Sequence, residues 1–272
     1  MPQLAAVYSH HLQSLLGQKI ALDAIEFTLW QSPSLLSSIL PQLTGYTTYF
    51  HGSNLADRVS LLPGARSQLS EILRLTRAKW FSTHISLLPL GWVWLSLRYD
   101  IHLPPPPIKW LLPRFIRRAK RLKAEHHQIP LLLENMPVEP RRVYKHFKHP
   151  DLIREVIEKT DCGLLLDLPH ARIAAEALGM ETTEYLQQLP LDRVVEIHTS
   201  GPTHRQDGIL IDQHAVMQDE DYRLLEWAMA HTPVQLVTLE YFKDREGLEE
   251  QLVELSRMIK QNDRREAYAA YR

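Results

Sequence analysis

The chain has 272 residues, 44% of them hydrophobic, which is enough for one large domain with a sizeable core. Its 31 Lys and Arg residues nearly balance its 32 Asp and Glu residues, so there is no general basic field to recruit nucleic acid, and a nucleic-acid partner is disfavoured. The single cysteine, Cys162, excludes an internal disulfide framework and indicates a reducing compartment.

The first residues and the longest apolar run argue against export and membrane insertion. The start, MPQLAAVYSHH, lacks a cationic region followed by a long apolar stretch, so we expect no signal peptide. The longest uncharged apolar run, Ile85 to Leu97, is interrupted by Pro89 and is shorter than the roughly 20 residues that a membrane span needs. We therefore expect a soluble, cytoplasmic protein with no membrane partner.

Eight short apolar segments recur along the chain, most of them separated by stretches with helical periodicity. The expected strands are Leu4 to Tyr8, Ala24 to Phe27, Thr47 to Phe50, Trp80 to Thr83, Pro130 to Leu133, Gly163 to Leu166, Val194 to Ile197 and Leu236 to Leu239. The expected helices are Pro33 to Gln42, Ala65 to Ala78, Leu112 to His126, Asp151 to Lys159, Thr182 to Leu189, Asp219 to Ala230 and Gly247 to Lys260. This alternation is typical of βα units, and it predicts the α/β class with a single (β/α)8 TIM-barrel domain over residues 1–272.

An aromatic and proline-rich segment, Ser86 to Pro113, interrupts the alternation after the fourth strand. Trp92, Trp94 and Trp110 flank the run Pro104 to Pro107, which is expected to be extended. We interpret the segment as a loop inserted at the catalytic end of the barrel. Two interpretations remain open: a hydrophobic lid packed on its own barrel, or a surface for a substrate or partner.

Metal-ligand side chains follow six consecutive predicted strands, at the point where each strand ends. They are His51, His84, Glu134, Asp167 with His170 behind it, His198 and Glu240. In a barrel these positions face the C-terminal mouth, so residues distant in the sequence converge there. The loop after the seventh strand adds Asp212 and His214, which point to the same side of an extended segment.

These candidate ligands are five imidazoles and four carboxylates, nine in all. Nine ligands are too many for one ion but suit two or three metals that share a bridging carboxylate. Taken alone, His198 after Val-Val-Glu-Ile would more simply be a hydrogen-bonded strand end than a metal ligand. Six in succession are not expected by chance, because such groups are costly to bury unless they are paired or bound to metal. The sequence therefore predicts a multinuclear site for two or three divalent ions.

The ordered ligand set resembles the pattern of the xylose isomerase-like barrel superfamily, which includes endonuclease IV. Within that superfamily the chain is most similar to the multinuclear non-heme iron oxidative enzyme family. The matching phrases are Phe50-His51-Gly52, Ser82-Thr83-His84, LLLENMP at 131 to 137, CGLLLD at 162 to 167, LPLDRVVEIHTSG at 189 to 201, GILIDQH at 208 to 214 and TLEY at 238 to 241. They cover most of the chain from residue 47 onward.

The sequence departs from the family's usual pattern in two places. The family usually carries Asn near the position of His170, where D-x-x-H is the form seen in endonuclease IV. Its segment after the eighth strand usually reads EWD, whereas here Tyr241 and Phe242 follow Glu240. These differences bear on the identity of the metal and on the reaction.

The resemblance also implies a grouping of the ligands. It implies one metal at His51 and His84, bridged by Glu134 to a second at Asp167, His198 and Glu240, with a third at His170, Asp212 and His214. The residues that we expect to carry catalysis are those of the bridge and the second metal: Glu134, Asp167, His198 and Glu240.

The function implied by the resemblance is the oxidative modification of a cysteine in a ribosomally made peptide. The partners would be the peptide substrate and a small protein that delivers it. Iron is favoured because sulfur ligation suits it, with zinc and manganese as alternatives. A metal-dependent hydrolase or endonuclease IV-like phosphodiesterase and a sugar isomerase or epimerase remain alternative functions.

Overall fold

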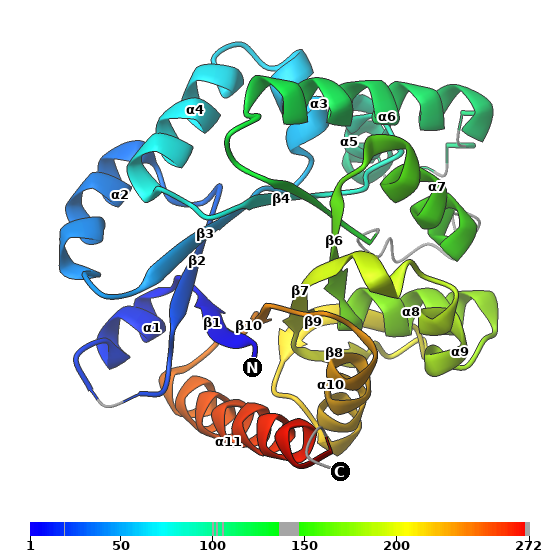
Figure 1. The fold of residues 1–272 in the computed structure, drawn as a ribbon. Coiled ribbons are helices and arrows are strands. Elements are labelled where there is room, and N and C mark those ends of the chain that lie inside the picture. Colours follow the sequence, from blue (N-terminus) through cyan, green and yellow to red (C-terminus); the bar gives the residue numbers. More distant parts are fainter. Residues whose placement is uncertain (19, 100, 102, 105, 136–146, 270–272) are drawn as a thin grey trace.

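Eight parallel strands close into a barrel in the order β1-β10-β7-β6-β5-β4-β3-β2 (Figure 1). The computed structural model describes residues 1–272 except 19, 100, 102, 105, 136–146 and 270–272. The strands are β1 (Gln3–Val7), β2 (Ala24–Thr28), β3 (Thr47–His51), β4 (Phe81–His84), β5 (Leu131–Glu134), β6 (Gly163–Asp167), β7 (Val194–Thr199) and β10 (Leu236–Leu239). The predicted α/β class, the barrel and its eight strands are confirmed, with small shifts at the strand ends.

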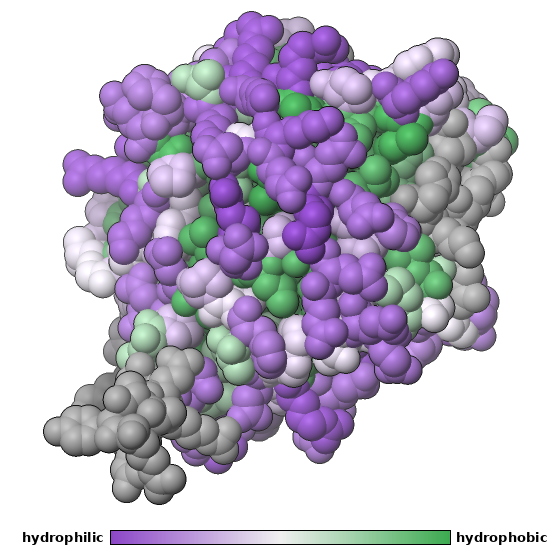
Figure 2. All heavy atoms as spheres, turned by 45° about the vertical axis from the view of Figure 1, so that its right-hand side comes forward, coloured by the Kyte–Doolittle hydropathy of each residue, from purple (hydrophilic) through white to green (hydrophobic). Residues whose placement is uncertain are grey.

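Helices form a ring around the outside of the barrel (Figure 1). They are α1 (His10–Leu15), α2 (Pro33–Ile39), α3 (Leu55–Leu61), α4 (Ala65–Thr76), α5 (Leu90–Tyr99), α6 (Ile108–Glu125), α7 (Pro150–Thr160), α8 (Leu168–Leu178), α9 (Thr182–Gln187), α10 (Asp219–His231) and α11 (Arg245–Ala269), with 3-10 turns η1 (Leu40–Gln42) and η3 (Leu191–Arg193). The face drawn in Figure 2 is covered mostly by hydrophilic side chains, as expected when each helix turns its apolar stripe toward the sheet. No helix within the described residues is long and apolar enough to cross a membrane.

The inward face of the strands changes from apolar to polar along the barrel axis. Near the N-terminal end, inward side chains form an apolar cluster of their own: Ala5, Ala24, Tyr49, Trp80, Leu132, Leu165 and Leu236. Successive inward positions of a strand are two residues apart. The candidate ligands of β3 to β6, and the residue that follows β10, lie two or four residues after members of this cluster and so on the same face. They are His51, His84, Glu134, Asp167 and Glu240. The fold therefore brings these side chains to the C-terminal mouth.

Several elements were not predicted from the sequence, namely α1, α3, α5, α8 and an antiparallel hairpin of β8 (Gly201–His204) and β9 (Leu210–Ala215). Helix α8 begins directly after β6, because Asp167 caps its first turn and Pro169 lies within that turn, where a missing N–H is tolerated. Gly179 ends α8 with a φ of 73°, a left-handed conformation that glycine adopts without strain. The hairpin carries Asp212 and His214 on β9.

The prediction of an inserted loop over 86–113 needs correction, because much of the segment is helical. It contains α5 and the start of α6, whose first residue is Ile108 rather than the predicted Leu112. Pro107 precedes this helix as its N-cap residue, and Pro113 lies inside its early turns. Trp92 Nε1 donates a hydrogen bond to the carbonyl oxygen of Pro104 at 3.2 Å. Residue 105 of the proline run, residues 136 and 137 of the LLLENMP phrase and residues 270–272 lie outside the described residues.

Gly201 lets β8 approach β9 closely at the base of the hairpin, where it pairs with Ala215. A Cβ at this residue would overlap the carbonyl group of Val216 and lie 3.0 Å from the carbonyl oxygen of Ala215. Both neighbours are backbone groups, so the hairpin itself has to move. We expect Gly201→Ala to lower the free energy of unfolding by about 1–3 kcal/mol, measured by denaturant unfolding.

The matched control for this change is Gly91→Ala. Gly91 lies in α5 with nothing within 4 Å of a Cβ. Because alanine favours a helix over glycine, the control should be neutral or slightly stabilising. Equal losses in the two variants would show that contact with the hairpin is not what requires glycine at position 201.

Candidate metal centre

Glu134 lies at the centre of the candidate ligands and touches two groups of histidines. Its Oε2 atom lies 3.4 Å from His51 Nε2 and 3.0 Å from His84 Nε2. The two imidazole nitrogens are themselves 3.2 Å apart. Three ligand atoms from β3, β4 and β5 therefore face one point, which is the arrangement that a bound cation requires.

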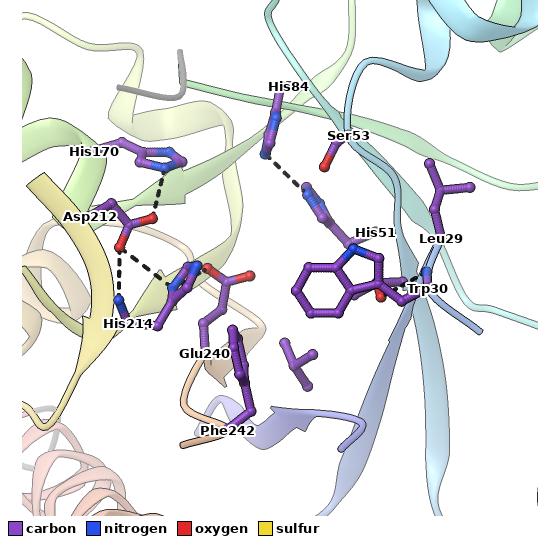
Figure 3. A pocket seen from close by; sticks show the side chains of 12 residues that line it. Leu29, Trp30, His51, Ser53, His84, His170, Asp212, His214, Glu240 and Phe242 are labelled. Carbon is purple, nitrogen blue, oxygen red and sulfur yellow. Dashed lines mark hydrogen bonds and ion pairs between the residues drawn. The ribbon is translucent and has the colours of Figure 1, made fainter. Parts of the chain in front are cut away.

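The other oxygen of Glu134 faces a second group, and Figure 3 shows the side chains of this group: His170, Asp212 and His214. This Oε1 atom lies 3.1 Å from His170 Nδ1. His170 Nε2 is in turn 3.5 Å from Asp212 Oδ2, and Asp212 Oδ1 is 3.5 Å from His214 Nδ1. Glu134 thus lies between the His51 and His84 pair and the α8 and β9 ligands.

The third group lies around His198 and Glu240. His198 Nδ1 is 3.4 Å from Glu240 Oε1, and Glu240 Oε2 is 3.7 Å from His214 Nδ1. Ligand atoms of Glu134, Asp167 and His198 all lie within 4.8 Å of one another. All nine residues singled out in the sequence are therefore parts of one connected cluster.

The cluster has a buried floor and an open side. Glu134, Asp167 and His198 are at most 1% exposed. The other members line a cavity of about 230 Å³: His51, His84, His170, Asp212, His214 and Glu240 (Figure 3). We expected the segment 86–113, inserted at the catalytic end, to border this cavity, but within the described residues none of its side chains contributes to the lining.

Local hydrogen bonds hold the strand ends in place. The side chain of Asn135 accepts from the backbone N–H of Asp167 at 2.7 Å and donates to its carbonyl oxygen at 2.9 Å. Asp167 Oδ1 accepts from the backbone N–H of His170 at 2.5 Å, while Oδ2 is buried and has no hydrogen-bond partner. His51 Nδ1 lies 2.8 Å from Ser82 Oγ, so its Nε2 is the atom presented to Glu134.

His214 is held in an unfavourable backbone conformation. Its φ is 45°, a left-handed value that is uncommon for a residue with a side chain. Its N–H donates to Asp212 Oδ1, two residues earlier in β9, at 3.2 Å. Strain of this kind persists where the surrounding structure enforces it, and it clusters at functional sites.

Buried atoms without hydrogen bonds test whether the cluster fits a metal. Buried groups of this kind normally have a partner, and each exception needs an explanation. Five ligand atoms of the cluster make no hydrogen bond: Glu134 Oε2, Asp167 Oδ2, His170 Nδ1, His198 Nδ1 and His214 Nδ1. Each is a nitrogen or oxygen of the type that binds divalent metals, so the residues present fit the metal ions that the sequence predicts.

Burial lowers the pKa of three imidazoles in the cluster, whereas nearby carboxylates raise it. Burial lowers the pKa of His51 to about 4, so this ring is neutral at neutral pH. Burial also disfavours the charged forms of His170 and His198. Nearby carboxylates outweigh that effect and raise the pKa of both rings well above its usual value.

The pKa values of the carboxylates also shift in both directions: three are lowered and one is raised. Burial acts against the ionised forms of Glu134 and Glu240, but neighbouring imidazoles hold the pKa of each below its usual value. His170 does the same for the pKa of Asp212 against the effect of burial. Burial raises the pKa of Asp167 well above its usual value, because the imidazole near it does not compensate. Bound cations would therefore stabilise the buried carboxylates of the cluster by neutralising their charge.

Two functional candidates, Glu26 and Glu196, were missed in the sequence. Glu26 Oε2 lies 3.2 Å from His198 Nε2, and Glu196 Oε1 lies 3.5 Å from the same nitrogen. Because the carboxylates occupy Nε2, the Nδ1 atom of His198 faces Glu240 and the metal centre. The available signal was their position inside predicted apolar strands, where a carboxylate is costly to bury unless it has a partner.

Glu26, Glu196 and His198 are also close enough together to hold an ion of their own. Glu196, however, already accepts hydrogen bonds from Trp80 Nε1 at 2.7 Å and from Thr238 Oγ1 at 2.6 Å. Burial raises the pKa of Glu26 to about 8, which favours its neutral form at neutral pH. We therefore interpret the pair as groups that orient His198 rather than as a separate metal site.

The strands and the mouth define a closed eight-stranded α/β barrel with a cluster of metal-ligand side chains. Among solved structures, SacUVDE matches with a TM-score of 0.55 and 12% identity over 96% of this chain and 100% of that chain. A protein assigned as a xylose isomerase from Rhodospirillum rubrum matches with a TM-score of 0.53 and 13% identity, over 97% and 98% of the two chains. At this identity the likeness shows the fold alone.

The family is shown by the sequence. A family model described as RiPP precursor modification enzyme MbnB/TglH/ChrH, where RiPP denotes a ribosomally made and then modified peptide, matches residues 38–262. The chain belongs to this family of enzymes, which confirms the resemblance inferred from the motifs.

Relatives of the chain carry the designation UPF0276. One from Psychromonas ingrahamii is 28% identical over 219 residues, which is 76% of this chain and 74% of that protein. Another, from Bordetella pertussis, is 35% identical over 108 residues. The matched region spans 37% of the length of the Bordetella protein.

Replacing Glu134 tests its central position. We expect Glu134→Ala to lose more bound metal than His51→Ala or His84→Ala, because its two oxygens face both histidine groups. The measurement is metal per protein chain after reconstitution and desalting, by elemental analysis. Asp221→Ala is the matched control, since Asp221 is a buried carboxylate that pairs with Arg172 outside the cluster. Equal metal losses from Glu134→Ala and each histidine variant would contradict the bridging role.

The raised pKa values of His170 and His198 predict pH-dependent metal binding. An imidazole must lose its proton before it binds a metal, and a raised pKa means that the proton is still present at neutral pH. Zinc affinity of chelator-treated protein should therefore rise between about pH 6 and pH 8, with release of protons, measured by calorimetry in buffers of different ionisation enthalpy.

A pair of variants separates this effect from the loss of a ligand. His51 is already neutral because its pKa is about 4, so His51→Ala should weaken binding but keep the proton release. His170→Ala should reduce the proton release. The same proton release from both variants would show that His170 does not carry the proton.

Proposed function

We propose that this chain is a metal-dependent enzyme that oxidatively modifies a cysteine of a peptide substrate, with iron as its favoured metal. The observation that carries the proposal is the set of buried ligand atoms without hydrogen bonds around Glu134, in a chain of a peptide-modifying family. Iron bound there would supply thiolate binding and the activation of dioxygen. Zinc and manganese use the same ligands and remain the alternatives.

The ligand set supports more than one ion. His51, His84 and Glu134 form one group of ligand atoms, and Glu134, Asp167 and His198 form another that shares the same carboxylate. A carboxylate shared by two groups is the usual bridge of a multinuclear site. His170, Asp212 and His214 are proposed to hold the third ion, beside the open side of the cavity.

The charges of the residues at the open side support a role in holding cations. Asp212 and Glu240 have lowered pKa values because of the imidazoles beside them, so both are ionised at neutral pH. Ionised carboxylates of this kind are poor bases but effective partners for a cation. We propose Glu134, Asp167, His198 and Glu240 as the residues closest to the reacting atoms.

The size of the cavity supports entry of a single side chain from a longer substrate. Its volume of about 230 Å³ lies below the range of roughly 300–1,000 Å³ that is usual for sites enclosing a whole small molecule. A cysteine side chain and its neighbour fit such a space while the rest of the peptide stays outside. The resemblance to enzymes that receive their peptide from a small protein supports a delivery protein as a second partner.

The proposal is tested by loading the protein with iron without oxygen and adding N-acetylcysteine amide. We expect an absorption band for charge transfer from thiolate to iron, and oxygen uptake when air is admitted. N-acetylserine amide is the matched control and should give neither signal. His84→Ala should lose the band, since it removes a ligand that lines the cavity.

The alternative functions give different results. Protein that binds zinc in preference to iron and hydrolyses bis(p-nitrophenyl) phosphate without oxygen would contradict the oxidative proposal and favour a phosphodiesterase. Interconversion of sugars without any response to the thiol would favour an isomerase.

A further inference from the structure

Two of the eight strands bring no candidate ligand to the mouth of the barrel. Strands β1 and β2 are neighbours in the barrel and end in Val7 and Thr28, both of which line the cavity. The turn after β2 adds Leu29 and Trp30 to the same lining. This part of the cavity lining is therefore mainly apolar, while the candidate ligands come from β3 to β7, α8, β9 and the residue after β10.

Trp30 is exposed to an unusual degree for so large an apolar side chain. It is 71% exposed, yet its ring packs edge-on against Phe242 with centroids 5.6 Å apart. Phe242 follows β10, which is the other neighbour of β1, and its ring lies 5.2 Å from that of His214. The two rings thus form a wall that continues directly into the ligand cluster (Figure 3).

The turn that presents Trp30 is fixed by buried hydrogen bonds. Gln31 Oε1 accepts from the backbone N–H of Thr28 at 2.7 Å, and Thr28 Oγ1 accepts from the backbone N–H of Trp30 at 3.3 Å. Gln31 is 7% exposed, so this anchor is shielded from water. A rigid turn that keeps an indole in solvent loses little entropy when a ligand covers the ring.

We propose that Trp30 and Phe242 form a binding site for an apolar side chain, preferably aromatic, of the peptide whose cysteine enters the metal centre. The inference rests on the proposed function and adds a substrate preference to it. A ring inserted beside Trp30 and Phe242 gains apolar burial and edge-to-face contact in a cavity too small for a whole drug-sized molecule. The residue next to the cysteine is the one that reaches this wall.

The test uses four probes: the N-acetylated dipeptide amides Cys-Phe, Cys-Gly, Ser-Phe and Ser-Gly. Their affinities for metal-loaded protein are measured by calorimetry without oxygen. We expect each Phe probe to bind about tenfold more tightly than its Gly counterpart, from burial of one aromatic ring. Trp30→Ser and Phe242→Ser should each reduce this ratio toward one, and Trp30→Phe should retain part of it.

The matched control is Trp110→Ser, because Trp110 is 66% exposed but lies on α6 and is not part of the cavity lining. This variant should keep the full preference for Phe. A ratio near one in the unaltered protein, or a ratio that survives both Trp30→Ser and Phe242→Ser, would overturn the proposal. Conversion of a dimer into a monomer by Trp30→Ser, seen by gel filtration, would assign the wall to contact between copies and would also overturn it.

The serine probes separate the two proposals. If the cysteine probes bind no more tightly than the serine probes, the thiol-directed function fails. A Phe preference that persists in the serine pair still supports the apolar site. If instead the cysteine probes bind tightly with no Phe preference, the function stands and the apolar site is refuted.

Discussion

The burial of ionisable groups at one end of an apolar barrel is the constraint on which the rest of this structure depends. Burial removes water from every charged group in the cluster, and the free-energy cost of this desolvation is offset only by an opposite charge, by hydrogen bonds or by a bound ion. Glu134 shows the balance most clearly, because it is 1% exposed and its pKa is still held below the usual value by histidines. Asp167 shows the opposite result, since its pKa is raised by burial despite the nearby His170. Because neighbouring charges offset the desolvation of some of these carboxylates and not of others, bound cations would stabilise the whole set better than any redistribution of protons among them.

The strands and their terminal ligands could be predicted from the sequence, for physical reasons that are visible in the barrel. Short runs such as Leu131 to Leu133 and Leu164 to Leu166 have to be buried on both faces, and the first charged residue after them marks the mouth. Helix α8 was missed because its first residues, LPHA, carry the signals of a turn. The helix begins there because the Asp167 side chain accepts a hydrogen bond from the backbone N–H of His170. The sequence pattern had predicted only metal binding for Asp167.

The contacts within the site could not be predicted in the same way. The pairing of Glu134 with His170 depends on the stagger of neighbouring strands and on side-chain rotamers, neither of which is written in the spacing of ligands. Glu26 and Glu196 were overlooked because only strand ends were compared, although both face inward one layer below the mouth. Their contact with His198 explains why two carboxylates lie in the otherwise apolar layer beneath the ligands: they fix which nitrogen of the imidazole is presented to the cavity.

The nine candidate ligands depend on two kinds of support that differ in rigidity. Those on strands are held by the ladders of the barrel and by side chains such as Ser82 and Asn135. Asp212 and His214 instead stand on a hairpin that is joined to the barrel through Gly201, and His214 keeps a left-handed backbone that a glycine would adopt with less strain. A side chain retained at such a position is better explained by what its ring contacts than by the stability of the hairpin. Asp212 and His214 of this hairpin face Leu29 and Trp30, which follow β2, across the cavity (Figure 3), so the mouth combines a strained, ligand-bearing side with an apolar side.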